Sequence, residues 1–335
     1  MLCIGIEGTA HTVGVGIVSS DGEILADERD MYHPPKGGIH PREAANHHAE
    51  VVVPMVNRAI EDANIRPRDL DIIAFSQGPG LGPCLRTVAT AARALSISLM
   101  RPIIGVNHCV AHLEIGRMNR ADSDPLMLYC SGGNTQVIAY AKRRYRVFGE
   151  TMDIGVGNML DKIGIMAGFG FYAGPKIEEM AKKGSELLDL PYSVKGMDVS
   201  FSGILTAARQ HINNGCSLED LCFSIQETVF SMLTEVTERA AAQADKKEIL
   251  LAGGVARNRR LAEMVRVMAE ERGATLFEPP FPFFADNGVM IAWNGLIAYS
   301  SGQRMTISDT VINQRYRTDQ VNVTWRQQPF RAVSK

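Results

Sequence analysis

The sequence is poor in the features that mark secreted, membrane-spanning or disulfide-linked proteins. Its 335 residues include six cysteines and two tryptophans, and no two cysteines form a Cys-x-x-Cys pair. This spacing argues against a thiolate zinc site or a disulfide framework and favours free thiols in a cytoplasm. No apolar run approaches the roughly 18 residues of a membrane span. The first residues (Met1-Leu-Cys-Ile-Gly-Ile6) lack the basic lead of a signal peptide. We therefore expect a cytoplasmic protein, or a nuclear one in a eukaryote.

A strong excess of one charge is also absent. The formal net charge is −2, with 45% hydrophobic and 21% charged residues. This balance excludes a globally basic nucleic-acid binder but leaves room for local basic surfaces, which a folded RNA partner requires. The length is too great for one compact core and fits two domains or a two-lobed α/β body.

The chain repeats one pattern of strands and turns. In each copy, three period-2 strands are separated by a glycine-containing hairpin and a turn, and a helical stretch and one more buried strand follow. The expected strands are 2–7, 13–18, 23–26 and 71–75 in the first copy and 126–130, 136–140, 145–148 and 248–252 in the second. Two βββαβα-like units predict an α/β fold of two homologous lobes with a cleft between them.

The same patterns define the lobes and their helices. We assign residues 1–125 to an N-terminal lobe, 126–326 to a C-terminal lobe with a helical insertion, and 327–335 to a flexible tail, because periodicity is lost after Trp325. Apolar spacing predicts helices over 41–64, 85–99, 177–183, 218–242 and 258–271. The glycine-dense stretch 164–174 is expected to be a loop.

Two histidines four residues apart form a candidate metal site. His108 and His112 would project from one face of a helix and supply two nitrogen ligands. A carboxylate could come from Asp286, in a turn that follows a long loop. Tyr129 could add a phenolate oxygen, which suits iron better than zinc. The cluster of His47, His48 and Glu50 is less suitable, because adjacent histidines diverge on a helix, and we expect a hydrogen-bonding role there.

A metalloprotease shares the histidine spacing but requires a glutamate directly after the first histidine. That position is Cys109 in this chain. Glu114 lies two residues beyond His112, about 160° away round the helix, so it cannot substitute. The missing glutamate therefore excludes a zincin-type protease.

Two glycine turns form a candidate nucleotide site. Ser131-Gly132-Gly133 offers successive backbone N–H groups that an anion can approach. Gly253–Gly254 lies between a buried strand and a helix that begins near Asn258, a junction where a base or ribose can lie against the backbone. Two acidic residues, Asp161 and Glu178, could bind ribose hydroxyls.

Seven motifs occur in an order that is typical of one family. They are Glu7-Gly-Thr-Ala-His11, Ser76-Gln-Gly-Pro-Gly-Leu-Gly82, Gly105-Val-Asn-His-Cys-Val-Ala-His-Leu-Glu-Ile-Gly116, Tyr129-Cys-Ser-Gly-Gly-Asn-Thr-Gln136, Val194-Lys-Gly-Met-Asp-Val-Ser-Phe-Ser-Gly203, Gly253-Gly-Val-Ala256 and Arg315-Tyr-Arg-Thr-Asp319. Together they closely resemble the archaeal and eukaryotic catalytic subunit of the KEOPS complex, the tRNA adenosine threonylcarbamoyltransferase. The resemblance covers residues 1 to about 326.

The resemblance implies an actin-like (ribonuclease-H-like) ATPase fold and a specific reaction. That reaction transfers threonylcarbamoyl from threonylcarbamoyl-AMP to adenosine 37 of tRNAs that decode ANN codons. It also implies one divalent metal ion, iron(II) more than zinc, and partner subunits that include a small atypical kinase and a small dimerising protein. The implied metal ligands are His108, His112, Tyr129 and Asp286. The implied contacts to the adenylate, or to an ATP- or AMP-like nucleotide, are Tyr129, Cys130, Ser131, Gly132, Gly133, Asp161, Gly174, Glu178 and Asn258.

The chain departs from the family at one loop. Phe171-Tyr-Ala-Gly174 replaces a run that is usually proline-glycine-glycine. We expect the bulkier Tyr172 and Ala173 to narrow the space for the nucleotide next to Gly174.

No side chain is an obvious catalytic nucleophile, so we expect direct transfer rather than a covalent intermediate. Two basic stretches, 142–146 and 257–260, could contact tRNA, with Tyr145 stacking on a base, or could equally be solvated surface. Two other functions remain open. One is a small-molecule phosphotransferase or ATPase of the same fold, although such enzymes usually carry aspartate where this chain has Glu7. The other is a non-catalytic scaffold that senses nucleotide.

Overall fold

The first strands form a mixed five-stranded sheet. The structure is a computed structural model that describes residues 1–34, 37–120 and 122–326. The strand order is β3-β2-β1-β4-β5. Strands β1 to β3 are antiparallel neighbours, and β4 and β5 continue the sheet in parallel with β1. The strands are β1 (Leu2–Glu7), β2 (Thr12–Ser19), β3 (Ile24–Met31), β4 (Ile72–Gly78) and β5 (Ile103–Asn107).

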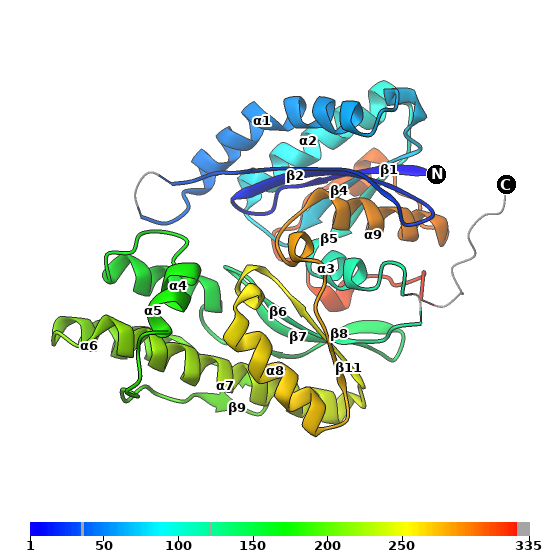
Figure 1. Cartoon of the computed structure of the whole chain (residues 1–335). Coiled ribbons are helices and arrows are strands. Elements are labelled where there is room, and N and C mark those ends of the chain that lie inside the picture. The colour runs from blue at the N-terminus through cyan, green and yellow to red at the C-terminus, as the bar shows by residue number, and fades with distance from the viewer. Residues whose placement is uncertain (35–36, 121, 327–335) are drawn as a thin grey trace.

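A second sheet repeats the topology of the first. Its order is β12-β11-β6-β7-β8, with antiparallel pairs among β6 to β8 and parallel pairs from β6 to β11 and β12. Its strands are β6 (Leu126–Cys130), β7 (Thr135–Ala141), β8 (Arg144–Glu150), β11 (Glu248–Ala252) and β12 (Thr275–Phe277). The predicted duplication is therefore confirmed, and the two sheets lie one above the other in Figure 1.

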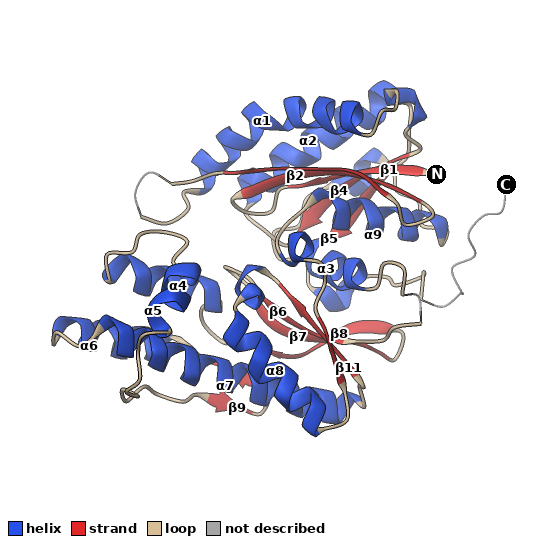
Figure 2. Ribbon diagram, viewed as in Figure 1, coloured by secondary structure: helices blue, strands red, loops and turns tan. Residues whose placement is uncertain are grey.

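Helices cover both sheets (Figure 2). The first sheet packs against α1 (Pro41–Asp62) and α2 (Gly82–Leu99) on one face and α9 (Gly288–Ser300) on the other. The second sheet packs against the long α7 (Leu218–Ala244) and α8 (Arg259–Glu271). The remaining helices of this half are α4 (Val156–Met166), α5 (Gly174–Ala181) and α6 (Ser202–Asn213).

Several short elements complete the described chain. A small hairpin pairs β9 (Val194–Lys195) with β10 (Asp198–Val199). The 3-10 helices are η1 (Pro67–Asp69), η2 (Gly254–Arg257), η3 (Phe281–Phe284), η4 (Ile307–Thr310) and η5 (Thr318–Gln320). None of the described helices is both long enough and apolar enough to pass through a bilayer.

The helix α3 (His108–Gly116) lies between the two sheets. All nine of its residues are buried. On one side, Ala111 and Ile115 pack with β4, β5 and α9, and on the other side Cys109, Val110 and Leu113 pack with β6, β7 and β11. The apolar residues of α3 lie on opposite sides of the helix, so burial on both sides is consistent with its central position in Figure 1.

Glycines bring α9 unusually close to the first sheet. A Cβ on Gly16 would lie 2.3 Å from the backbone nitrogen of Val289, and one on Gly288 would lie 2.2 Å from the nitrogen of Gly16. A methyl group cannot fit at such distances, so the helix and strand can touch backbone to backbone only because both positions are glycine. This close contact fixes the start of α9, and with it the turn that carries Asp286.

The structure corrects two expectations about the chain. The predicted loop over 164–174 is wrong at its start, because α4 continues to Met166. The predicted loss of order after Trp325 is wrong for Arg326, whose guanidinium donates to Asp124 at 2.8 Å and stacks 4.2 Å from the Tyr140 ring centroid. The predicted tail 327–335 lies outside the described residues. The division into lobes at residue 125 stays a prediction. Helix α9 lies beyond residue 125 in the sequence but packs on the first sheet.

Candidate metal and nucleotide site

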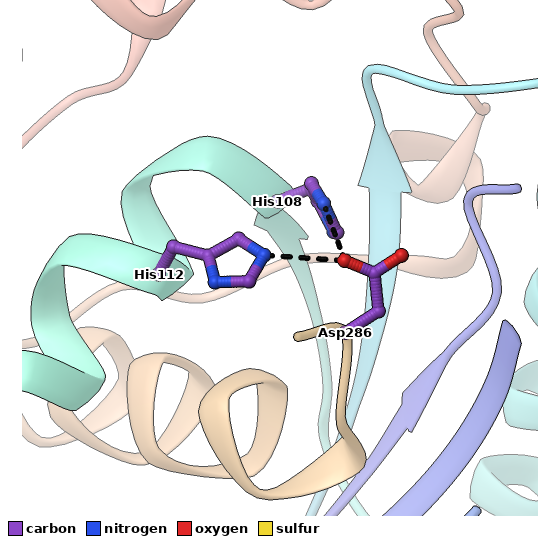
Figure 3. A group of neighbouring side chains, drawn as sticks. All are labelled: His108, His112 and Asp286. Carbon is purple, nitrogen blue, oxygen red and sulfur yellow. Dashed lines mark hydrogen bonds and ion pairs between the residues drawn. The ribbon is translucent and has the colours of Figure 1, made fainter. Parts of the chain in front are cut away.

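Three of the predicted ligands meet where α3 faces the start of α9. The Nε2 atoms of His108 and His112 lie 3.4 and 3.3 Å from the same Asp286 oxygen, Oδ1. Figure 3 shows both rings directed toward that carboxylate. One donor atom from each residue lies within 4.8 Å of the others. The helical spacing therefore places the two imidazoles as predicted.

Local capping explains why α3 starts at His108. Asn107 ends β5, and its side-chain oxygen accepts a hydrogen bond from the Val110 N–H at 3.1 Å. This N-cap satisfies a free amide of the first turn. A second N-cap fixes the other side of the cluster, because Asn287 accepts from the Met290 N–H at 2.8 Å directly after Asp286.

Tyr129 completes a set of four oxygen and nitrogen donors. It is the penultimate residue of β6, is fully buried, and its hydroxyl lies 2.9 Å from His108 Nε2. The centroids of the Tyr129 and His112 rings lie 4.9 Å apart, and the planes of the two rings are inclined by 36°. Burial raises the pKa of the phenol, so ionisation of Tyr129 requires a neighbouring cation.

The spacing of these donors fits a transition-metal ion. In a tetrahedral site with metal–nitrogen distances of about 2.0–2.1 Å, neighbouring donor atoms are about 3.3 Å apart. The three separations of 2.9, 3.3 and 3.4 Å in this cluster match that value. Two imidazoles, a carboxylate and a phenol suit zinc or iron rather than magnesium or calcium.

The charges of the cluster are strongly coupled. Burial opposes charge on Asp286, but His108 and His112 outweigh it and hold the carboxyl pKa well below its usual range. Burial likewise opposes charge on His108, but Tyr129, Glu7 and Asp286 raise the imidazole pKa. The pKa of His112 is lowered, mainly by burial. The cluster therefore favours the anionic form of Asp286, and a bound cation would require unprotonated ligating nitrogens on His108 and His112.

The sequence analysis missed a supporting role for Glu7. This carboxylate is completely buried at the end of β1, and its Oε2 lies 3.1 Å from His108 Nδ1. Its other oxygen accepts from the Thr9 N–H at 2.8 Å. A carboxylate on the far nitrogen of a ligating histidine fixes the orientation and tautomer of the ring. The signal that could have revealed it is an ionisable residue at the end of a fully apolar strand.

The predicted phosphate loop lies between β6 and β7 and is held by the start of α4. The Gly157 and Asn158 N–H groups donate to the carbonyls of Ser131 and Gly132 at 3.1 and 2.8 Å. Within the described chain, neither the Gly132 nor the Gly133 N–H donates a hydrogen bond. Two adjacent unpaired amides on a fixed turn could receive an anion, and the phosphate site stays a prediction. Cys130 is different, because its side chain lies in the core.

The remaining predicted nucleotide contacts lie on three elements. Asp161 of α4 accepts from the Ala173 N–H at 2.8 Å, and Glu178 of α5 accepts from the Arg259 N–H at 3.2 Å. Asn258 caps α8, and its amide donates to Gln226 at 2.6 Å. These side chains are therefore partly occupied by structural hydrogen bonds. Gly174 has open space where a Cβ would stand.

The departure at residues 171–174 does not narrow the space at Gly174. Ala173 is buried in the core, and no atom comes within 4 Å of a Cβ placed on Gly174. Tyr172 adopts a left-handed backbone with φ 61° and is 40% exposed. The expected obstruction is therefore wrong. Instead, the Phe171 ring meets the edge of His11, from the turn between β1 and β2, at 6.2 Å.

One predicted role in tRNA contact is also wrong. Tyr145 is fully buried and donates its hydroxyl to Glu114, so it cannot stack on a base. Arg260 forms ion pairs with Glu227 and Glu263, and tRNA contact by the stretch 257–260 stays a prediction. The expected hydrogen bonding of His47 is confirmed, since its Nε2 lies 2.9 Å from Asp30. Glu114 faces away from the metal cluster, as its helical position predicted, and accepts from Trp325.

Two sheets of equal topology, with a four-donor cluster between them, define an actin-like α/β protein with a candidate metal centre. Solved structures agree with this fold. A HypF protein from T. kodakarensis superposes with a TM-score of 0.65 at 15% identity, over 93% of this chain and 49% of its own. A component of (R)-2-hydroxyglutaryl-CoA dehydratase from Acidaminococcus fermentans superposes with a TM-score of 0.57 at 13% identity, over 90% of this chain and 98% of its own.

Sequence comparison assigns the family. The family model TsaD, tRNA N6-adenosine threonylcarbamoyltransferase, matches residues 23–293, and the chain belongs to this family. A tRNA N6-adenosine threonylcarbamoyltransferase of Thermococcus gammatolerans is 56% identical over 97% of this chain and 100% of its own. A probable bifunctional tRNA threonylcarbamoyladenosine biosynthesis protein of Methanocaldococcus jannaschii is 55% identical over 97% of this chain. The chain spans 60% of the length of that bifunctional relative.

Proposed function

We propose that the chain is a tRNA N6-adenosine threonylcarbamoyltransferase. It transfers the threonylcarbamoyl group from threonylcarbamoyl-AMP to the exocyclic amine of adenosine 37 in tRNAs that decode ANN codons. Support comes from the family match over residues 23–293 and from 56% identity to a relative of that name across nearly the whole chain. The observation that carries the proposal is the convergence of His108, His112 and Asp286 beside the loop that is suited to an anion.

His108, His112, Tyr129 and Asp286 hold one divalent metal ion, with iron(II) favoured over zinc because of the phenol. When bound, the ion supplies Lewis-acid polarisation of donor oxygens. Glu7 orients His108 from behind. The buried Tyr129 and His112 rings exclude water from one side of the centre.

The amides of Gly132 and Gly133 bind the anionic part of the adenylate. Because α4 fixes their loop through the Ser131 and Gly132 carbonyls, the donor is held without reorganisation of the backbone. Asp161, Glu178, Gly174 and Asn258 line the path of the ribose and base. Asp161 belongs to α4, Gly174 and Glu178 belong to α5, and Asn258 lies between η2 and α8, a few residues after the glycine turn Gly253–Gly254.

Transfer to the amine is direct. The two cysteines nearest the centre are poor nucleophiles, since burial raises the pKa of Cys109 to about 11 and also raises that of Cys130. The adenylate is already a good leaving group, so the chain needs to orient the carbonyl carbon rather than activate a nucleophile. The attacking amine loses a proton and AMP leaves with the bridging oxygen.

tRNA and other KEOPS subunits, including a small atypical kinase and a small dimerising subunit, are the proposed partners. The name of the bifunctional relative joins tRNA threonylcarbamoyladenosine biosynthesis to a second function in one polypeptide. A phosphotransferase is less well supported, because Glu7, which stands in place of the aspartate that organises magnesium, is hydrogen-bonded to His108 and Thr9.

The test is reconstitution with a donor-generating enzyme, ATP, threonine, bicarbonate and tRNA, followed by digestion to nucleosides. We expect threonylcarbamoyladenosine from the wild type, and loss of both bound metal and product from the double variant His108→Ala/His112→Ala. The activity loss should exceed about 100-fold, because the ligands themselves are removed. His211→Ala, which changes an exposed histidine on α6, is the matched control. A double variant that modifies tRNA at the wild-type rate would contradict the proposed metal role.

A further inference from the structure

The most exposed aromatic ring of the described residues lies a few residues before Asp286. Phe281 opens η3 and is 65% exposed. A large apolar side chain in this position forfeits the favourable free energy of burial. Nothing in the metal cluster or the phosphate loop uses this ring.

One face of the Phe281 ring is covered by a guanidinium. The Arg257 Cζ lies 4.3 Å from the ring centroid, and Arg257 Nη2 donates to the Phe281 carbonyl at 3.2 Å. The Nε of Arg257 is buried and has no hydrogen-bond partner among the described residues. Since the ring is nevertheless mostly exposed, its opposite face is open. The pair is a preformed layer with a free aromatic surface.

Two hydrogen bonds and the short distance along the chain to Asp286 tie this layer to the candidate site. The Phe284 carbonyl, at the end of η3, accepts from the Gly253 N–H at 2.8 Å, within the glycine turn. Arg29 of β3, in the first lobe, donates to the Pro282 carbonyl. Asp286 follows Phe284 after one residue. The position of the ring is thus fixed relative to both lobes and to the metal cluster.

The charge in the part of the ring's surroundings that the structure describes is mixed and includes an arginine without an ion pair. Arg259 is exposed, and its side chain makes no ion pair with another described residue. The acidic groups nearby are engaged, because Glu178 accepts from the Arg259 amide and Glu278 pairs with Arg266 at 2.6 Å. Arg29 pairs with Asp27. Arg257 and Arg259 therefore leave a local positive surface around the ring, which attracts a phosphate backbone.

We propose that Phe281, backed by Arg257, is a stacking platform for an unpaired base of the tRNA, next to the adenosine that enters the site. An open aromatic face, a cation behind it and a free arginine beside it are the elements with which proteins bind single-stranded RNA. The proposal rests on the proposed function, since that function defines the RNA. It assigns Phe281 to substrate binding and not to the chemical step.

The experiment compares Phe281→Leu with Phe281→Trp in the full chain, with whichever partner subunits the wild-type reaction needs. The readouts are the Kd for an unmodified tRNA transcript by fluorescence anisotropy, and the KM for tRNA and kcat of transfer. We expect the leucine variant to raise Kd and KM for tRNA about tenfold, within the range for loss of one base–aromatic stack. The tryptophan variant should restore both. Metal content, kcat and the KM for the donor should stay at wild-type values.

A second arginine–aromatic stack provides a matched control. Arg304 lies 3.8 Å from the Tyr299 ring centroid on α9, and Tyr299→Leu should leave the KM for tRNA unchanged. The proposal is overturned if Phe281→Leu binds tRNA as the wild type does, if it lowers only thermal stability, or if Tyr299→Leu has the same effect. Failure of the proposed function looks different, because the wild type would then form no threonylcarbamoyladenosine, while the anisotropy comparison would still decide the role of Phe281 in RNA binding.

Discussion

Single residues in this protein act through their neighbours. Glu7 does not reach the candidate metal position. Its carboxylate accepts a hydrogen bond from Nδ1 of His108, on the side of the ring away from that position, and a second one from the Thr9 N–H. Such a carboxylate raises the basicity of the ring and prevents it from rotating. Affinity for metal should therefore depend on a residue that provides no ligand atom.

Replacing Glu7 with glutamine tests this dependence. The amide keeps the size of the side chain but loses its charge, so the metal should bind about tenfold more weakly, in the range known for removal of such partners. The measurement is metal affinity by competition with a chelator. Glu50→Gln, on the exposed side of α1, is the control and should bind metal normally. Equal affinities for Glu7→Gln and the wild type would show that His108 needs no support.

The residues of the candidate centre could be predicted where spacing or motif carried the information. His108 and His112 share a helix face, and the glycine turn at Ser131 follows from the strand pattern. The roles of Glu7 and Phe281 could not be found in this way, because they depend on contacts with residues distant in the sequence. Glu7 contacts His108, 101 positions away, and Phe281 contacts Arg257, 24 positions away. The prediction that Tyr145 stacks on a base was wrong for the same reason, since nothing near Tyr145 in the sequence indicates that it is buried against Glu114.

At the scale of elements, helix starts are determined by polar groups from distant segments. The start of α6 is held by Asp153, which lies before α4 and accepts from the Phe201 and Ser202 N–H groups at 3.0 Å each. Burial would raise the pKa of this carboxyl, but the backbone hydrogen bonds outweigh it and lower the pKa below its ordinary value of 3.8. The contact joins two helices that the sequence did not predict.

This contact gives a pH dependence of known sign. A lowered pKa in the folded state means that the stabilising contribution is present above pH 3.8 and is lost as the pH falls toward the folded value. Asp153→Asn should therefore unfold at a lower urea concentration than the wild type at pH 7, and the difference should shrink below pH 3.8. Asp62→Asn, on the exposed end of α1, should match the wild type at both pH values. A constant difference across the pH range would show that charge on Asp153 is not the cause.

Elements with clear periodicity were predicted, and elements without it were not. Strands β1, β2, β6 and β7 and helices α1, α7 and α8 follow apolar patterns of period 2 or 3.6 and were found. Helix α9 is apolar on every side, so it has no face to detect, and its packing depends on glycines that normally weaken a helix. In α4, glycines at 157 and 164 hide the helix in the same way.

At the scale of the whole molecule, a buried polar network connects α3 to the end of the described chain. Glu114 is almost fully buried and accepts from Tyr145, from Trp325 Nε1 at 2.7 Å and from Arg117 at 2.7 Å. These partners come from β8, from the C-terminal segment and from the residue directly after α3. A buried carboxylate needs all such donors, because their hydrogen bonds offset the free energy required to remove the charge from water. Loss of one hydrogen bond leaves part of that free energy uncompensated and destabilises the fold.

Two tyrosine–glutamate hydrogen bonds, one buried and one exposed, allow the effect of burial on the free energy of unfolding to be measured. Tyr145→Phe removes a donor from the buried Glu114 and should destabilise the protein by about 1–3 kcal/mol. Tyr192→Phe removes a similar bond to Glu235 at an exposed position, and its effect should stay within about 0.5 kcal/mol. Urea unfolding of both variants is the measurement. Equal losses would mean that burial of Glu114 does not increase the value of its hydrogen bonds.

The donors of the candidate centre come from residues 108, 112, 129 and 286, so the last of them belongs to the final sixth of the chain. Under the proposed function, all four donors are present only after a ribosome has passed residue 286. A nascent polypeptide that ends before η3 would carry both imidazoles and the phenol but would lack the carboxylate of Asp286.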